Sequence, residues 1–535
     1  MSDTLFCLFY FLLFAVFILK SKWFRAGTFG NIYFLGAFCL KLLFGMGLWY
    51  IYTHIYKNRI TSDVFKYYDD GKMIFATLHT SVKDYLTLLT GIGDANSRYQ
   101  TIYHTMNSWD NGYDSTLYNN SHFIIRLNAF FMLFSQGHYG VHVIFMCFIA
   151  LTGLTYIFKA FYPFPVTGGN LLFAAVFLFP SVILWSSGIL KEGLVWLGLG
   201  STIYYFFKAV NGQWSVARER IVSYSVYFIA GVILLYEVKA YVLLCLLPGL
   251  VAQFLIKRTG FFGRHPLICY ILVLVIYIQP AVFPSLLGSK HNPLQMLSDK
   301  QTDFNRISKG GVYLENMKDS TKYAFISVKD TVNILPLNTW ADSVLKKGIQ
   351  YVAGKPFWYS EYKTNHRAPY ALRKGTAYSL IQLGNKDTLH TASTDSTAYW
   401  VYNYIETANS RIIIDPIKPT ILSLIAHIPV ALDVSMLLPY PWQIHSAMQA
   451  IYCGENIFVL LLFTVALFFI KRPIGNMDLV LFCLTYCMAM LILIGLVTPI
   501  LGGIERYKSV VIPFMFILLL LIIGTNEKPK MKNEK

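Results

Sequence analysis

Charged residues are scarce in this chain. Only 14% of its 535 residues are Asp, Glu, Lys or Arg, whereas soluble domains carry about 25%. At the same time 55% of the residues are hydrophobic, so a soluble fold would have too little polar surface to cover its core. The composition therefore excludes an ordinary soluble protein and predicts an all-α polytopic membrane protein.

The chain also lacks the short motifs that mark several enzyme classes. It contains no P-loop, dinucleotide fingerprint, zinc motif or Gly-x-Ser-x-Gly elbow, which argues against ATP-driven transport by this chain alone. Its eight cysteines lie mostly inside apolar runs and show neither a disulfide framework nor metal-ligand spacing. We interpret them as small hydrophobic residues.

The excess of basic residues follows the membrane topology. The formal charge of +17 comes from Lys and Arg that cluster in short loops between apolar runs, which is the positive-inside pattern. Attraction to anionic lipid headgroups explains most of the remaining excess. We therefore expect membrane lipids as partners and no nucleic acid.

About eleven apolar runs are long enough to cross a membrane, which takes about 20 helical residues. The first has no basic segment before it and no small-residue cleavage site after it, so we expect a retained helix. With the basic loops in the cytoplasm, the N-terminus lies outside and the C-terminus inside. The runs lie near 4–20, 30–55, 139–158, 169–186, 190–208, 221–237, 240–256, 266–287, 453–471, 477–498 and 509–525.

This topology divides the chain into three parts. Residues 1–287 form a transmembrane region with an external acidic loop at 56–138. Residues 288–452 form an external (periplasmic) domain with a small α/β insertion, ending in an interfacial apolar stretch. Residues 453–535 supply the last transmembrane helices and a basic cytoplasmic tail.

Some external segments have recognisable patterns. Residues 75–92 and 122–134 have the apolar positions of interfacial helices that lie on the outer leaflet. Alternating residues around 376–404 predict a few strands, and the Pro-bearing apolar stretch at 419–445 is expected to enter the interface.

Carboxylates in the first external loop are the main catalytic candidates. Asp63, Asp69 and Asp70 follow a membrane-spanning run, and on a helix their spacings of six and seven bring them near one face. Such carboxylates can act as a general base on an acceptor hydroxyl, or bind a divalent cation such as Mg or Mn near a lipid phosphate. We assign the cation to Asp69 and Asp70. The structural alternative is a solvated helix start.

Basic residues on the same outer side are candidates for binding a phosphate. Lys191 and Glu192 begin a helix after a loop, and Lys and Glu beside an apolar run are costly unless they are paired or functional. Arg506 offers a planar fork for phosphate oxygens, although it and Lys508 could instead reach lipid headgroups. Arg126, in the apolar segment 122–134, is a further candidate.

One outer turn has a structural interpretation. Glu237 and Lys239 stand in the short turn between two apolar runs, and we interpret them as a surface ion pair, which would face the same external cavity as Lys191.

The acidic first loop, the interfacial helices behind it and the late external domain resemble the GT-C superfamily of polyprenyl-phosphate-dependent glycosyltransferases. The Phe-Pro-Ser…Trp-Ser-Ser-Gly…Lys-Glu run at 179–192 and the Glu-Arg-Tyr-Lys run at 505–508 are similar to uncharacterised members of bacterial envelope-glycan clusters. The resemblance implies that Asp63, with Asp69 and Asp70 as rivals, is the base or metal ligand, and that Lys191 and Arg506 hold the lipid phosphate.

The expected function is an integral membrane glycosyltransferase in a bacterial inner (cytoplasmic) membrane. Its donor would be a polyprenyl-phosphate-linked sugar and its acceptor a glycan, lipid or protein outside the membrane. Three alternatives stay open. An O-antigen polymerase or ligase would use His366, Arg367 or Arg373. The others are a flippase or transporter of lipid-linked glycan and a structural envelope subunit.

Overall fold

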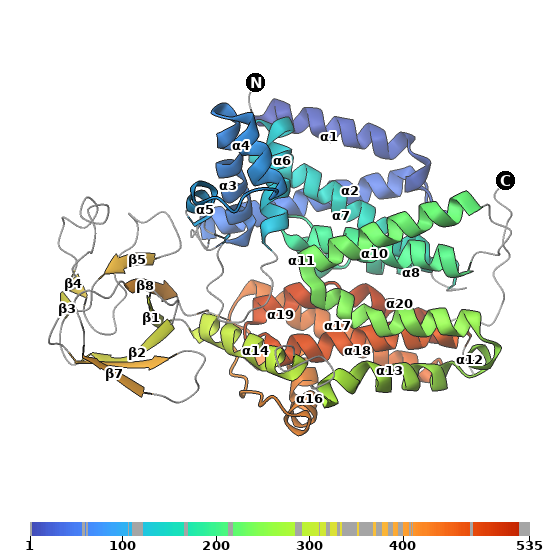
Figure 1. The fold of residues 1–535 in the computed structure, drawn as a ribbon. Coiled ribbons are helices and arrows are strands. Elements are labelled where there is room, and N and C mark those ends of the chain that lie inside the picture. Colours follow the sequence, from blue (N-terminus) through green and yellow to red (C-terminus); the bar gives the residue numbers. More distant parts are fainter. Residues whose placement is uncertain are drawn as a thin grey trace.

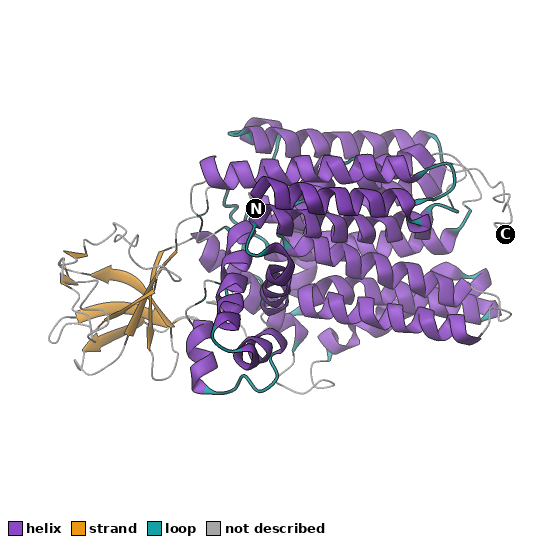
Figure 2. Ribbon diagram, turned by 90° about the horizontal axis from the view of Figure 1, so that it is seen from above, coloured by secondary structure: helices purple, strands orange, loops and turns teal. Residues whose placement is uncertain are grey.

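A computed structural model gives the fold of the protein (Figure 1). Its helices run side by side in one bundle, and a separate group of strands lies beyond one end of that bundle (Figure 2). The residues that the structure describes are 3–55, 59, 62–104, 106, 108–109, 121–164, 169–211, 218–283, 292–309, 311–316, 322–328, 332–333, 350–351, 367–370, 377–382, 389–393, 400–405, 408, 410–470 and 475–523.

Within these ranges, seven helices are long and apolar enough to cross a membrane, and an eighth span results if the bent pair α19–α20 is counted. The chain is thus a multi-pass membrane protein with a helical membrane region. The spans are α1 (Asp3–Lys20), α2 (Asn31–Tyr50, continued by a π-helical turn at Ile51–Ile55), α7 (Tyr139–Phe161), α10 (Lys191–Asn211), α11 (Arg218–Arg258), α17 (Ala447–Phe468), α18 (Met477–Val497), and α19 (Leu501–Lys508) with α20 (Ile512–Ile523), bent by 49°.

The predicted number of eleven spans is too high for the described helices. The run at 169–186 is divided into α8 (Gly169–Phe177) and α9 (Pro180–Trp185), because Pro180 starts a new helix. The runs at 221–237 and 240–256 are confirmed as the two halves of α11, which are two helices that meet at Lys239, where φ is −153° and ψ is 78°. Figure 1 shows the chain reversing direction there, so each half of α11 lies along the bundle.

The remaining apolar helices are short. The run predicted at 266–287 forms α13 (Pro266–Val282), which follows the short α12 (Gly260–Arg264). The stretch at 419–445 contains α16 (Ile421–Met436), followed by a 3₁₀ turn at Pro441–Gln443.

Four helices of the acidic loop cover one end of the bundle, which we call the α3–α6 end (Figure 1). The helix predicted at 75–92 is broken by a 3₁₀ turn at Thr77–His79, whereas the one predicted at 122–134 is confirmed as α6. Both α14 and the strands lie toward this end, and the described C-terminal helix points to the other (Figure 1). The four helices are α3 (Asp63–Ala76), α4 (Val82–Thr90), α5 (Ser97–His104) and α6 (His122–Ser135).

The insertion after α14 (Pro293–Lys309) contains only strands among its described residues, so the expected α/β insertion is a β-sheet preceded by a helix. Six strands form an antiparallel sheet in the order β5-β8-β1-β2-β6-β7, and β3 pairs with β4. In the register, Tyr313 pairs with Ala324 and with Asn403. The strands are β1 (Gly311–Asn316), β2 (Lys322–Val328), β3 (Val332–Asn333), β4 (Gln350–Tyr351), β5 (Arg367–Tyr370), β6 (Ala377–Gln382), β7 (Leu389–Ser393) and β8 (Trp400–Ile405).

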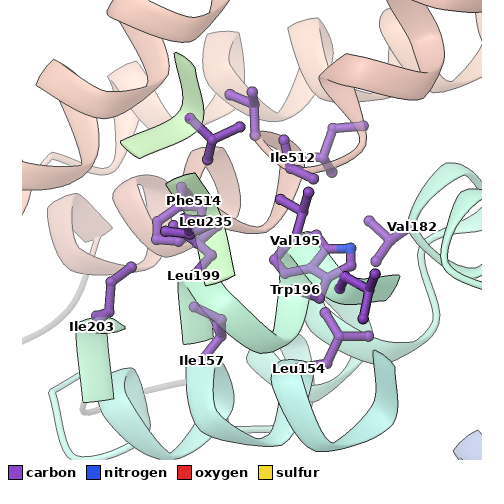
Figure 3. Close-up of a cluster of buried hydrophobic side chains, with 14 of the residues drawn as sticks. Leu154, Ile157, Val182, Val195, Trp196, Leu199, Ile203, Leu235, Ile512 and Phe514 are labelled. Carbon is purple, nitrogen blue, oxygen red and sulfur yellow. The ribbon is translucent and has the colours of Figure 1, made fainter. Parts of the chain in front are cut away.

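The core of the bundle lies between α7, α10 and the first half of α11, with α9 and α20 on its other side (Figure 3). Its side chains are almost wholly inaccessible and lock the helices that carry the site into one unit. The labelled members are Leu154, Ile157, Val182, Val195, Trp196, Leu199, Ile203, Leu235, Ile512 and Phe514.

Glycines let α7 and α10 approach closely. A Cβ on Gly153 would lie 2.3 Å from the backbone carbon of Trp196, and one on Gly200 would lie 2.2 Å from the carbonyl oxygen of Gly153. Backbone atoms cannot rotate away as side chains can, so any side chain at these positions would push the helices apart.

Replacing Gly153 by alanine should destabilise the protein by about 1–3 kcal/mol, the usual effect of overpacking a core. The matched control is Gly36→Ala, because a Cβ at Gly36 on α2 meets nothing within 4 Å. Thermal unfolding of both variants in the same detergent measures the difference. Equal unfolding midpoints would contradict this close packing of α7 on α10.

Candidate functional site

The charged side chains of the site come from four distant parts of the chain. Asp63 is the first residue of α3, Lys191 and Glu192 begin α10, and Arg506 lies in α19. Lys239 lies at the interruption of α11. The starts of α3 and α10, the interruption in α11 and α19 all lie toward the α3–α6 end of the bundle (Figure 1).

Arg506 joins two carboxylates. Its Nε donates to Glu192 Oε1 at 2.6 Å, and one of its terminal nitrogens donates to Asp63 Oδ2. The Arg506 side chain is only 13% exposed, so the guanidinium is largely removed from water. A buried guanidinium is stable only when it is paired, and here the two anions come from α3 and from α10.

Glu192 holds a second cation. Its Oε1 also accepts a hydrogen bond from Lys239 Nζ at 2.6 Å, while its Oε2 is buried with no hydrogen-bond partner among the described residues. The Lys239 ammonium lies 4.3 Å from the centre of the Tyr507 ring, a cation–π contact. Glu192 is therefore the centre of a three-charge arrangement and more than a helix-capping residue.

Asp63 is also held by two cations. Besides Arg506 it pairs with Lys66, one turn further along α3, at 2.6 Å. Burial alone would raise the pKa of Asp63, but Lys66 and Arg506 outweigh it and hold this pKa well below its usual range. In this arrangement Asp63 is an ionised carboxylate and a weak base.

Lys191 completes what we call the Arg506 cluster, which consists of Asp63, Lys66, Lys191, Glu192, Lys239 and Arg506. The Lys191 ammonium donates to Ser121 Oγ at 3.0 Å and lies 5.2 Å from the centre of the Tyr67 ring. It also interacts electrostatically with Asp63 and Arg506. Four of the six side chains are basic and two are acidic, so basic groups outnumber carboxylates in the cluster.

The loop before α10 is fixed by α2. The buried Lys41 ammonium donates to Ser186 Oγ, and Gly45 lies so close to the loop that a Cβ there would be 2.3 Å from the carbonyl oxygen of Ser187. Ser186 and Ser187 precede Lys191 by only a few residues. The packing of α2 on this loop thus helps to set where Lys191 and Glu192 begin their helix.

Asp69 and Asp70 have other partners. Asp69 forms a two-bond ion pair with Arg59 at the surface, with distances of 2.8 and 2.7 Å. Asp70 is inaccessible and accepts the backbone N–H of Ser108 at 2.7 Å. Although α3 is helical as predicted, the two carboxylates are held by separate groups.

The described residues do not fit a metal site. Within them, no group of three or more His, Cys, Asp or Glu side chains could hold a metal ion. The divalent cation at Asp69 and Asp70 therefore stays a prediction without support from their partners, and no step is derived through it.

Two other predicted phosphate ligands have partners outside the Arg506 cluster. Arg126 pairs with Asp94 at 3.1 Å and lies 5.0 Å from the centre of the Trp109 ring. Lys508 donates to Glu505 Oε1 at 2.6 Å and to Asn456 Oδ1 at 2.7 Å. Both basic groups are therefore already compensated by these partners in the described structure.

The interpretation of Glu237 and Lys239 as a surface ion pair is wrong. Lys239 is buried and its ammonium pairs with Glu192, because the interruption in α11 turns it into the bundle. The signal in the sequence was a lysine between two long apolar runs, where an uncompensated charge is unfavourable. Lys66, one turn after Asp63, was missed as well.

Replacing Glu192 by glutamine should lower stability by about 3–5 kcal/mol, because it leaves two buried cations without their shared anion. The matched control is Asp69→Asn, which breaks an exposed ion pair worth at most about 1 kcal/mol. Thermal unfolding in the same lipid nanodiscs compares the two. A loss no larger for Glu192→Gln than for Asp69→Asn would contradict the buried arrangement.

Comparisons with known proteins found no relative of this chain. No protein-family model, no curated protein and no solved structure matches the chain. The argument for function therefore rests on the residues of the Arg506 cluster and on its place at one end of a membrane-embedded bundle.

Proposed function

We propose that the protein is an integral membrane glycosyltransferase that uses a polyprenyl-phosphate-linked sugar as donor and a glycan, lipid or protein as acceptor. The observation that carries the proposal is the contact of Arg506 with both Asp63 and Glu192. It joins a candidate base from the first loop to the candidate phosphate ligands of α10 and α19. The resemblance to the GT-C superfamily supports the same assignment.

The charge of the cluster supports a phosphate as its ligand. Four basic groups stand against two carboxylates, and an anionic phosphate would add a partner for the basic groups. The Arg506 fork suits phosphate oxygens, and Lys191 adds a point charge beside it. Since the cluster lies at the end of membrane-spanning helices, a phosphate carried on a lipid tail would reach it from the bilayer.

In the proposed reaction, the acceptor hydroxyl attacks the anomeric carbon of the donor sugar. The new bond joins the acceptor oxygen to that carbon, and the bond from the carbon to the phosphate oxygen breaks. Arg506 and Lys191 stabilise the charge that collects on the leaving phosphate. The proton of the acceptor hydroxyl passes to Asp63.

The ion pairs of Asp63 require the donor to bind before Asp63 accepts the proton. While Arg506 and Lys66 hold Asp63, its low pKa makes it a poor proton acceptor. A donor phosphate that binds Arg506 gives the guanidinium another anion and weakens its hold on Asp63. The basicity of Asp63 then rises only when the donor is in place.

We also propose that the α3–α6 end faces the outside of a bacterial inner membrane, with the N-terminus outside and the C-terminus in the cytoplasm. The basic loops support this orientation, since they follow the positive-inside pattern. It places the Arg506 cluster where lipid-linked sugars meet external acceptors.

A flippase or transporter of lipid-linked glycan is the second candidate. It is favoured by two interrupted helices, at the break between α8 and α9 and at the bend between α19 and α20, since broken helices often line transport sites. The polymerase or ligase alternative rests on His366, Arg367 and Arg373. Of these, His366 and Arg373 lie outside the described residues, and Arg367 is placed only as a position in β5.

The test is complementation of a host that lacks this chain, followed by mass spectrometry of its lipid-linked and surface glycans. Wild type should restore the missing sugar, whereas Asp63→Asn and Arg506→Gln should leave the polyprenyl-linked donor to accumulate. Loss of a general base lowers such rates by about 10²–10⁴-fold.

The matched variant is Asp69→Asn, which removes a nearby carboxylate that pairs only with the exposed Arg59 in the described structure. It should restore the glycan at an equal expression level. Full restoration by Asp63→Asn would overturn the transferase assignment and favour the polymerase or flippase. A glycan profile unchanged by deletion would contradict all three.

A further inference from the structure

A second buried group of charges lies in the C-terminal half of the bundle. It consists of Glu455 and Asn456 on α17 and Glu505 and Lys508 on α19. Glu455 is 7% exposed and Glu505 is 0% exposed. Glu455 lies eight residues after the start of α17, which places it ~12 Å along the helix axis. The Arg506 cluster uses none of these four residues.

Glu455 and Glu505 have four carboxylate oxygens, and two of these accept hydrogen bonds. Lys508 Nζ donates to Glu505 Oε1 at 2.6 Å and to Asn456 Oδ1 at 2.7 Å. Glu455 Oε1 accepts the backbone N–H of Ser181 at 2.8 Å. The second oxygens of both Glu455 and Glu505 are buried and have no hydrogen-bond partner among the described residues.

A small cavity adjoins Glu455. Glu455, Asn456 and Lys508 supply its polar wall, and its other walls are apolar side chains of α16, α17, α18 and α20. The unpartnered Oε2 of Glu455 therefore belongs to a side chain that lines a small space whose walls are mostly apolar. Such an oxygen is unfavourable as part of an anion, because nothing in the apolar walls can replace its lost hydration.

The charges of the group do not balance. The charged side chains that face Glu455 are Glu505 and Lys508, both from α19, whereas the described lining from α16, α18 and α20 adds none. Two ionised carboxylates and one ammonium would leave one net negative charge inside the bundle. Lys508 forms its hydrogen bonds with Asn456 and Glu505, so within the described structure Glu455 has no ion pair of its own.

We propose that Glu455 is a proton-binding site within the membrane-embedded bundle. One proton taken from water, carried on Oε2 of Glu455, neutralises the group and converts an unpartnered acceptor into a donor. A metal cation is disfavoured in the same place, because the Lys508 ammonium lies on the wall of the cavity and would repel it. This inference does not depend on the proposed glycosyl transfer.

The position of the site links the proton to the Arg506 cluster. Arg506 lies on α19 between Glu505 and Lys508, and the helix thus contacts both groups of charges. Ser181, which binds the other oxygen of Glu455, lies at the start of α9, shortly before Lys191 and Glu192. Loss of the proton would put a charge between the two segments that carry the phosphate ligands, so proton occupancy is expected to change anion binding at Arg506.

The first test is infrared spectroscopy of the full-length protein in nanodiscs at pH 6. Wild type should show the C=O stretch of a protonated carboxyl group, and Glu455→Gln should remove it. Glu505→Gln should keep that band if Glu455 is the proton carrier. A spectrum in which Glu455→Gln leaves the band unchanged, or in which wild type has none, would overturn the proposal.

The second measurement localises the proton without any substitution. Dicyclohexylcarbodiimide modifies protonated carboxyl groups in apolar surroundings, and peptide mass spectrometry shows which residue reacts. We expect labelling of Glu455 that falls as the pH is raised, and none at Glu192, which is ionised between Lys239 and Arg506. Labelling of Glu192 to the same extent as Glu455, or labelling of Glu455 that does not depend on pH, would contradict the assignment.

Activity measurements separate this inference from the transferase proposal. Retention of the infrared band in a protein that transfers no sugar would overturn only the transferase. Normal transfer in a protein without the band would overturn only the proton site.

Discussion

The structure of the site depends on one buried guanidinium. Arg506, in α19, contacts Asp63 at the start of α3 and Glu192 at the start of α10. None of these charges could be buried alone, since an unpaired ion inside a protein is strongly destabilising. The three segments are therefore tied together by charge as well as by packing.

Much of this site could be predicted from the sequence, and the part that could not follows from geometry. Lys191, Glu192 and Arg506 stand out because charges beside apolar runs are unfavourable unless they are compensated or used. Spacing on α3 could not separate Asp63 from Asp69 and Asp70, because the distinction lies in their partners, which come from elsewhere in the chain.

The membrane helices could also be predicted from the sequence, but their interruptions could not. Long apolar runs indicate membrane helices, but they do not show where a helix is interrupted. The break at Pro180 and the interruption at Lys239 both fall within or between such runs, and the second places Lys239 beside Glu192. Lys239 was misassigned for that reason: its partner, Glu192, depends on a bend that hydropathy cannot reveal.

The most direct test of the account is a double-mutant cycle between Asp63 and Arg506. The unfolding free energies of Asp63→Asn, Arg506→Gln and the double variant are measured in nanodiscs, with Asp478→Asn, whose carboxylate pairs with Lys257, as the unrelated partner in a second cycle. A coupling of about 0.5–3 kcal/mol between Asp63 and Arg506, with near-additivity for Asp478, is the predicted result. Additive effects of Asp63 and Arg506 would show that the first loop and α19 are not joined, and would contradict the site as a whole.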